Sequence, residues 1–206
     1  METMKRMPDN FVDLVLTDPP YGIGYNSQEA FRGKKRAKTS DSYVKYKKYD
    51  WDNIKISEDV FKEIFRISKN QAIFGANYYS DYLPQSNGWI FWDKLRDKTF
   101  NFSHGELIWL SINQRVKKLT QSPVDESRGG LDRVHPTQKP IKLIRYILSQ
   151  FNNIDIVYDP FIGSGTTAVA CEMEGRQWIG SEINKDYCEI ANKRINAERN
   201  QMKLAI

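Results

Sequence analysis

The chain has 206 residues, of which 40% are hydrophobic and 28% are charged, a balance that is typical of one globular domain and excludes a disordered or fibrous chain. No apolar run approaches the length needed to span a bilayer, and the polar N-terminus has no apolar signal core, so we expect a soluble intracellular protein. The net charge is +5, and the two cysteines and two histidines lack metal-ligand spacing, which argues against a disulfide framework and against a zinc site.

Short apolar runs and helical patterns alternate along the chain. In chain order, we expect a strand at 11–17, a helix at 57–69, strands at 71–75, 88–92 and 106–112, a helix at 140–151, a strand at 154–158, a helix at 166–174, a strand at 177–182 and a helix at 185–198. This alternation predicts an α/β domain with a mostly parallel sheet. No internal repeat or linker interrupts it, so residues 1–206 are predicted to form a single domain.

Two basic segments, at about 22–50 and 111–134, lack helical or strand periodicity and are predicted to be long loop insertions. A single such segment is usually solvated surface. Two of them, the first interleaved with tyrosines, favour a polyanionic partner. The side chains expected to contact it are Arg32, Lys34, Lys35, Arg36, Lys47, Lys48, Arg115, Lys117, Lys118, Arg128 and Arg133.

One candidate site is the turn after the strand at 154–158, Asp159-Pro-Phe-Ile-Gly-Ser-Gly-Thr-Thr167. Ligands of open parallel sheets bind beyond the carboxyl ends of the strands, where Gly163 and Gly165 let the backbone approach a ligand and the next helix offers unpaired N–H groups. Glu182 ends the following strand and can accept both hydroxyls of a ribose. The pattern favours a nucleoside, and the missing Gly-Lys-Ser/Thr lysine argues against an NTPase.

A second candidate site is Asp18-Pro-Pro-Tyr21, at the end of the first predicted strand. The prolines stiffen the turn, so that the Asp18 carboxylate and the Pro19 carbonyl can accept two hydrogen bonds from an NH₂ group. Tyr21 offers a face on which a planar ring can stack. Such a turn is more often structural when it stands alone. At a strand end, in a chain that also holds a nucleoside site, it favours binding of a base.

These two motifs, with His135-Pro-Thr-Gln-Lys-Pro140 between them, resemble the S-adenosylmethionine-dependent DNA amino-methyltransferases of restriction–modification and orphan systems. The catalytic motif precedes the cofactor motif, which is the circularly permuted order of the β class. The resemblance implies a Rossmann-like methyltransferase fold, with a mostly parallel twisted sheet and helices on both faces. Family members begin with a further strand that ends in Gly-Asp. The acid of that strand would fall just upstream of Met1, which leaves three alternatives: Glu2 substitutes for it, the true start of the chain lies upstream, or the chain is a truncation that binds the cofactor weakly. Our hypothesis is an upstream start or a truncation, because Met4-Lys-Arg-Met7 resembles the helix that follows the missing strand in the family.

The resemblance implies S-adenosylmethionine as cofactor, with no metal, and assigns roles to residues of the motifs. The target base would be held by Asp18, Pro19, Pro20 and Tyr21. The cofactor would be held by Asp159, Pro160, Phe161, Gly163, Ser164, Gly165, Thr166, Thr167 and Glu182, with Thr137, Gln138, Lys139 and Pro140 closing over its methionine end. The basic side chains of the two insertions would bind double-stranded DNA, and the second insertion would be a short target-recognition region.

The implied reaction is direct in-line attack of a flipped base's exocyclic amine on the sulfonium methyl group. An aspartate at the first motif position is typical of adenine-methylating members, whereas cytosine-amine enzymes usually carry Ser-Pro-Pro-Tyr, so we expect methylation at N6 of adenine. The alternatives are N4-cytosine methylation and a catalytically impaired DNA-binding relative. Methylation of RNA adenine or of a protein glutamine is disfavoured by Asp18 and by the motif order. A second copy of the chain and a restriction enzyme are further partners that the resemblance allows, in the bacterial cytoplasm near the nucleoid or from a phage.

Overall fold

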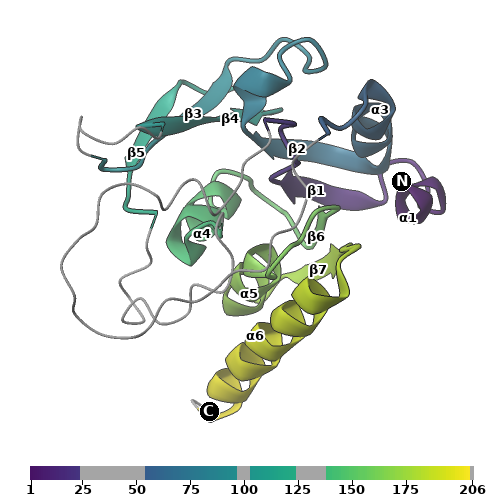
Figure 1. The fold of residues 1–206 in the computed structure, drawn as a ribbon, viewed down its shortest axis with the longest axis vertical. Helices are drawn as coiled ribbons and strands as arrows, with labels where there is room; N and C mark the ends of the chain where they lie inside the picture. Colours follow the sequence, from purple (N-terminus) through teal and green to yellow (C-terminus); the bar gives the residue numbers. More distant parts are fainter. Residues whose placement is uncertain (24–53, 97–102, 124–137, 205–206) are drawn as a thin grey trace.

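A seven-stranded sheet organises the computed structural model, which describes residues 1–23, 54–96, 103–123 and 138–204 (Figure 1). The strands are β1 (Val12–Thr17), β2 (Ser68–Phe74), β3 (Gly88–Asp93), β4 (Gly105–Leu110), β5 (Lys117–Thr120), β6 (Ile156–Asp159) and β7 (Gln177–Gly180). Their order is β5-β3-β4-β2-β1-β6-β7. Only β4 runs antiparallel to its neighbours, so the prediction of a mostly parallel α/β sheet is confirmed.

Helices cover both faces of the sheet, as expected. They are α1 (Glu2–Lys5), α3 (Glu58–Ile67), α4 (Ile141–Leu148), α5 (Thr166–Met173), α6 (Lys185–Leu204) and a short 3₁₀ turn, η1 (Ala76–Tyr78). The apolar residues of α1 and α3 pack on one face, and those of α4 and α5 pack on the other. Helix α6 packs against α5 on its outer side. No helix among the described residues is long and apolar enough to span a membrane.

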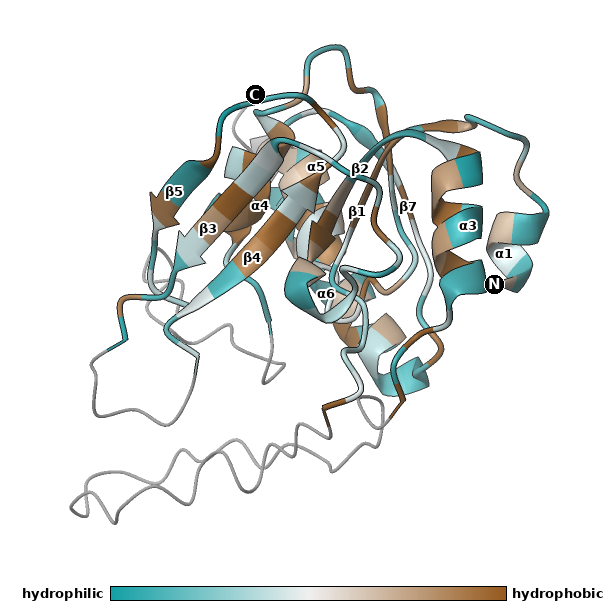
Figure 2. Ribbon diagram, turned by 90° about the horizontal axis from the view of Figure 1, so that it is seen from above, coloured by the Kyte–Doolittle hydropathy of each residue, from teal (hydrophilic) through white to brown (hydrophobic). Residues whose placement is uncertain are grey.

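The central strand β1 is buried on both faces. Leu14 and Leu16 lie in the core under α4 and α5, and Val15 lies in the core under α3, all of them almost without solvent exposure. A strand that is covered on both faces reads as a continuous apolar run rather than an alternating one. Figure 2 shows this as hydrophobic colour along the middle of the sheet, whereas α3 carries alternating hydrophilic and hydrophobic bands.

Several predicted bounds differ from the structure by a few residues: α3 ends at Ile67, α4 at Leu148, β7 at Gly180 and α6 at Leu204. Two differences have a clear physical reason. β2 begins at Ser68 rather than at residue 71, because α3 ends at Ile67 and the chain turns at once into extended backbone. Lys117–Thr120 lies in the segment predicted to be a loop but forms β5. Its parallel pairing with β3 supplies the hydrogen bonds, so this strand depends on a sheet neighbour and leaves no apolar pattern in its own sequence.

Parallel β1, β3 and β6 bring three strand ends to one edge of the sheet, at Thr17, Asp93 and Asp159. The antiparallel strand β4 delivers its first residues to that same edge, because Glu106 pairs with Trp92 near the end of β3. Residues that follow β1 and β6, and those that begin β4, therefore face a common region.

At the opposite edge, the Asp13 carboxylate ties three strands together. Its Oδ2 accepts the backbone N–H groups of Asp155 (3.0 Å) and Ile156 (2.9 Å) at the start of β6, and its Oδ1 lies 2.7 Å from Lys69 Nζ of β2. The hydrogen bond from Lys69, with those from the β6 backbone, lowers the pKa of Asp13 to about 2.

Asp13→Ala is expected to lower the free energy of unfolding at pH 7 by about 2 kcal/mol, because hydrogen bonds to a charged acceptor are worth about 1.5–3 kcal/mol each. The folded pKa lies below the ordinary value, so this stabilisation is present above pH 4 and fades as pH falls toward 2. Urea unfolding at pH 7, 5 and 3 measures both effects. Asp59→Ala, which removes an exposed carboxylate paired with Lys62, should change stability by less than about 0.5 kcal/mol. Equal losses in the two variants would contradict this account.

Candidate functional site

A cavity of about 390 Å³ opens at the carboxyl edge of the sheet, beside the ends of β1 and β6. Both sequence motifs contribute to its lining, so the structure brings the two predicted sites into one. The predicted residues that line it are Asp18, Pro20, Gln138, Lys139, Asp159, Phe161, Gly163, Ser164, Thr166, Thr167 and Glu182. Pro19, Tyr21, Pro140, Pro160 and Gly165 lie next to lining residues without belonging to the lining themselves.

The glycine turn is held close to α6. Gly165 precedes α5 with φ +82°, and a Cβ atom there would lie 2.9 Å from the Cβ of Ala191, so only glycine fits. Arg194 of α6 donates from Nη1 to the Ser164 carbonyl (2.6 Å) and hydroxyl (2.9 Å). The turn therefore has a fixed shape, with the first N–H groups of α5 directed away from the helix body.

Asp159 ties the end of β6 to β1 and α5. Its Oδ1 accepts the Thr17 hydroxyl (2.8 Å) and the Phe161 N–H (3.0 Å), and its Oδ2 accepts the Thr167 hydroxyl (2.7 Å). Burial outweighs these hydrogen bonds and raises the pKa of Asp159 to about 6. Thr17 was not among the predicted site residues, because its place at the end of an apolar run carries no chemical signal.

Glu182 lies two residues beyond β7, with its carboxylate held by backbone donors. Oε2 accepts the Gly163 N–H (3.0 Å) and Oε1 accepts the Asn184 N–H (2.8 Å). A carboxylate has about four acceptor positions, so each oxygen can accept one further donor. The neighbouring Ile183 also lines the cavity, and its side chain is fully exposed.

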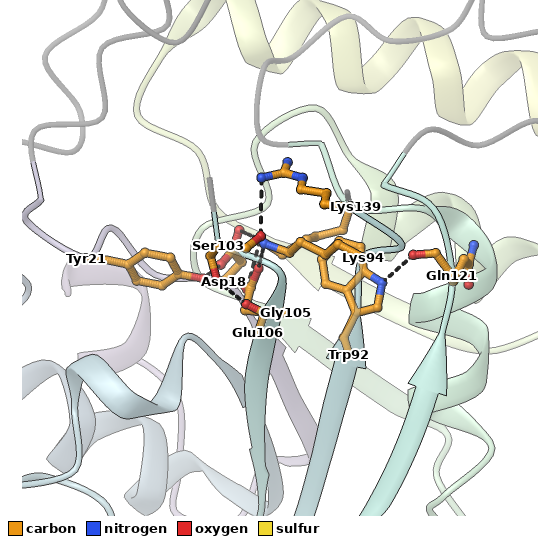
Figure 3. Close-up of polar contacts among 10 residues, drawn as sticks. Asp18, Tyr21, Trp92, Lys94, Ser103, Gly105, Glu106, Gln121 and Lys139 are labelled. Atoms are coloured by element: carbon orange, nitrogen blue, oxygen red, sulfur yellow. Dashed lines mark hydrogen bonds and ion pairs between the residues drawn. The ribbon is translucent and has the colours of Figure 1, made fainter. Parts of the chain in front are cut away.

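The Asp18 turn lies in a buried group of charged side chains that converge from distant parts of the chain (Figure 3). The Asp18 carboxylate accepts from the Tyr21 hydroxyl and from Lys139 Nζ. The Tyr21 oxygen is also 2.8 Å from Glu106 Oε1. Lys139 Nζ is 3.3 Å from Glu106 Oε1, and Lys94 Nζ is 2.8 Å from Glu106 Oε2. We call these five residues the carboxylate–lysine cluster.

Most of the cluster is shielded from water, and Asp18 is the most exposed of its four charged members, with 26% of its side chain exposed. The side chains of Glu106, Lys139 and Lys94 are 9%, 11% and 13% exposed. Burial raises the pKa of Asp18 against the opposing attraction of Lys139. Burial acts in the same direction on Glu106, but the ammonium groups of Lys139 and Lys94 prevail and lower its pKa to about 2. Two carboxylates and two ammonium groups balance one another, as buried charges must.

The Tyr21 ring is already stacked on another aromatic side chain. Its centroid lies 4.8 Å from that of Tyr78, at an interplanar angle of 17°, and Tyr79 meets it edge-on. The Tyr79 hydroxyl donates to the Pro20 carbonyl and so helps to fix the turn. A base that stacks on the same face of Tyr21 requires Tyr78 to move.

Three of the predicted polyanion-binding residues lie in the described part of the chain. Lys117 donates to Gln150 Oε1 at 2.5 Å, and Lys118 pairs with Asp93 at 2.8 Å. Arg115 precedes β5 and lies at the sheet edge opposite the cavity. The remaining predicted residues fall outside the described residues: Arg32, Lys34, Lys35, Arg36, Lys47, Lys48, Arg128, Arg133 and, from the cofactor set, Thr137.

Two members of the cluster, Lys94 and Glu106, were missed by sequence reasoning. Neither belongs to a recognisable motif, and Glu106 read as the first residue of an ordinary strand. The signal that would find them is the antiparallel pairing of β3 with β4, which is a tertiary feature.

Comparison with known proteins assigns the family. The model of the N6_N4_Mtase family, described as DNA methylase, matches residues 30–193. The chain therefore belongs to this family and is a DNA methyltransferase of the N6-adenine/N4-cytosine type, which confirms the resemblance seen in the motifs.

Individual relatives agree with this assignment. The Type II methyltransferase M.HpaI of Haemophilus parainfluenzae is 29% identical over 243 aligned residues, which cover 97% of this chain and 73% of the relative. Two solved structures share the fold. The M1.HpyAVI complex with S-adenosylmethionine has a TM-score of 0.60 at 21% identity, covering 94% of this chain and 92% of its own. The cytosine-N4-specific PvuII methyltransferase has a TM-score of 0.57 at 15% identity, covering 93% and 82%. The predicted Rossmann-like methyltransferase fold is thereby confirmed.

The raised pKa of Asp159 predicts a pH dependence of stability. Between the ordinary value of 3.8 and about 6, the folded protein holds a proton that the unfolded chain has lost, so stability falls as pH rises through this range and is level above it. Asp159→Asn removes this titration. The stability of the wild type relative to the variant should therefore fall by about 2–3 kcal/mol between pH 4 and 7. Urea unfolding across that range measures the difference, and a pH-independent difference would contradict the assignment.

Proposed function

We propose that the chain transfers the methyl group of S-adenosylmethionine to the exocyclic N6 amine of adenine in double-stranded DNA. The observation that carries this proposal is a single cavity whose lining includes both Asp18 and the glycine turn with Glu182. Direct transfer requires an amine-binding group and a nucleoside site that open into the same space, because the reacting atoms must meet in line.

The cavity fits the cofactor in its chemistry. Glu182, fixed by two backbone donors, has acceptor positions left for the ribose hydroxyls, and the exposed Ile183 beside it offers an apolar wall to a purine ring. The N–H groups at the start of α5, with Gln138, would meet the methionine end. Bound there, S-adenosylmethionine supplies a methyl group on a positively charged sulfur. The solved M1.HpyAVI relative, which shares this fold, is described as a complex with that molecule.

Asp18 supplies the acceptor that the amine needs. The lone pair of an exocyclic amine is delocalised into the base, which makes it a poor nucleophile. Hydrogen bonds from its protons to the Asp18 carboxylate and the Pro19 carbonyl favour the charge that develops on nitrogen during attack. Because burial raises the pKa of Asp18, its carboxylate is also suited to receive the proton that the methylated amine must lose.

Adenine is proposed as the base because an aspartate at the first position of the motif is typical of adenine-methylating members of the family. The fold does not decide between the bases, since it is shared with a methyltransferase named as cytosine-N4-specific. We further propose that residues 1–206 act as one catalytic domain, and that basic side chains of 22–50 and 111–134 contact DNA phosphates. Lys117 and Lys118 would give up their contacts with Gln150 and Asp93 to do so.

The test of the reaction is transfer of labelled methyl from S-adenosylmethionine to unmethylated duplex DNA, followed by nucleoside analysis. We expect the label in N6-methyldeoxyadenosine. We also expect Asp18→Ala to lose at least about 10²-fold in activity, since removal of one group that stabilises the transition state costs about 10²–10³. Asp9→Ala, which removes an exposed carboxylate, is the control and should remain active. Label in N4-methylcytosine would overturn the choice of base, and no label from the wild type would overturn the reaction.

The test of the cofactor site is Glu182→Gln, measured as the affinity for S-adenosylhomocysteine by calorimetry. We expect a loss of at least about tenfold, because each hydrogen bond to a charged acceptor is worth about 1.5–3 kcal/mol. Glu174→Gln removes a carboxylate that pairs with Arg145 outside the cavity and should leave the affinity unchanged. Equal affinity of the wild type and Glu182→Gln would place the ribose elsewhere.

A further inference from the structure

Glu106 is buried beside the catalytic motif but belongs to no motif. It is the second residue of β4 and lies opposite Trp92 of β3. Its carboxylate meets three donors: the Tyr21 hydroxyl at 2.8 Å, Lys94 Nζ at 2.8 Å and Lys139 Nζ at 3.3 Å. Replacing a buried ion pair by apolar residues is often neutral or stabilising, so stability alone does not account for a paired carboxylate at this position.

Lys94 and Lys139 differ in their ion-pair partners. Among the carboxylates of the described residues, Lys94 pairs with that of Glu106, and its ammonium lies 4.9 Å from the centre of the Trp92 ring. Lys139 contacts both Asp18 and Glu106, and lies 5.0 Å from the centre of the Phe74 ring. Lys94 therefore forms its ion pair with Glu106, whereas Lys139 forms ion pairs with both Asp18 and Glu106.

The proposed function creates a conflict at Asp18. Its carboxylate has to accept the amine of the target base, yet in this structure its Oδ1 already accepts the Tyr21 hydroxyl and its Oδ2 already accepts the Lys139 ammonium group. A lone pair remains on each oxygen, but the positive charge of Lys139 at this position opposes the positive charge that develops on the amine during attack. The amine can displace these donors only if they keep a partner, because an ammonium group left unpaired in this buried position is strongly unfavourable. Both donors are already within contact distance of Glu106.

We propose that Glu106 is a positioning residue for the target base, which takes over Lys139 and the Tyr21 hydroxyl when the base amine binds Asp18. The proposal rests on the proposed function, since it concerns how the same site exchanges one set of donors for another. Glu106 acts through Lys139 and Tyr21 and does not touch the reacting atoms. Lys94 balances the charge of Glu106 before and after the exchange.

Glu106→Gln is the first test, because it preserves shape and removes the charge that attracts Lys139. Lys139 then stays on Asp18 and competes with the base amine, so less of the bound DNA carries a correctly held base. With labelled methyl transfer to unmethylated duplex DNA, we expect kcat to fall by about tenfold or more. The KM for DNA and the affinity for S-adenosylhomocysteine should change by less than about threefold, since phosphate and cofactor contacts remain.

A matched control is Glu172→Gln. Glu172 is also a largely buried, ion-paired carboxylate, with Arg199 Nη2 at 2.6 Å and Trp178 Nε1 at 2.8 Å, and it lies on α5 outside the cavity lining. It should keep the wild-type kcat. This control separates the loss of a buried ion pair from the loss of this particular acceptor.

A second test removes the competitor. In Glu106→Gln/Lys139→Met the ammonium group that contacts Asp18 is removed, while Lys94, which contacts Glu106, remains. Loss of Glu106 then has no further effect, and the double variant should match Lys139→Met in kcat within about threefold. A purely structural role for Glu106 would instead make the two losses multiply. The double variant removes one negative and one positive charge, so the net charge of the cluster is unchanged. This comparison therefore stands even if Glu106→Gln alone does not fold.

The outcomes separate the two claims. An inactive wild type overturns the proposed function. An active wild type, with unchanged kcat in Glu106→Gln or a further tenfold loss in the double variant relative to Lys139→Met, overturns the role of Glu106 and leaves the proposed function intact.

Discussion

The partly buried carboxylate of Asp18 is the constraint on which the site depends. The Asp18 side chain is 26% exposed and stands at the end of a largely buried strand, so its charge is stabilised by opposite charges close by. Lys139 pairs with Asp18 and also with Glu106, and Lys94 pairs with Glu106, so that two positive charges neutralise two negative ones. This chain of ion pairs fixes four segments that are far apart in the sequence, and it holds the Tyr21 hydroxyl between two carboxylates. The electrostatic requirement of one residue thus constrains the side of the cavity that we propose to bind the base.

The sheet topology places this cluster beside the glycine turn, so that the two line one cavity. β1 and β6 are neighbours although more than a hundred residues separate them, so the Asp18 turn and the glycine turn meet at one edge. Asp159 fastens them together through Thr17 of β1 and Thr167 of α5. The antiparallel strand β4 is the one that enters from the opposite direction, and for that reason it can place a residue from its beginning, Glu106, among residues that follow strand ends.

Both motifs were readable from the sequence because each is a local pattern, a strand followed by a turn whose residues have few structural alternatives. The class of fold followed from the alternation of strands and helices. Lys94 and Glu106 were not readable, since their role depends on the direction and register of β4 against β3. β5 was missed for a related reason, because Lys117 and Lys118 form a strand through pairing with β3 and not through an apolar pattern of their own. The stacking of Tyr21 on Tyr78 likewise depends on where η1 lies after β2.

The most direct measurement of this account is a crystal structure of the protein with S-adenosylhomocysteine and duplex DNA. The account predicts an adenine outside the duplex stack with its amine on Asp18, and Lys139 Nζ in contact with Glu106 but no longer with Asp18. An adenine amine bound away from Asp18, or Lys139 still paired with Asp18 while the base is in place, would contradict it.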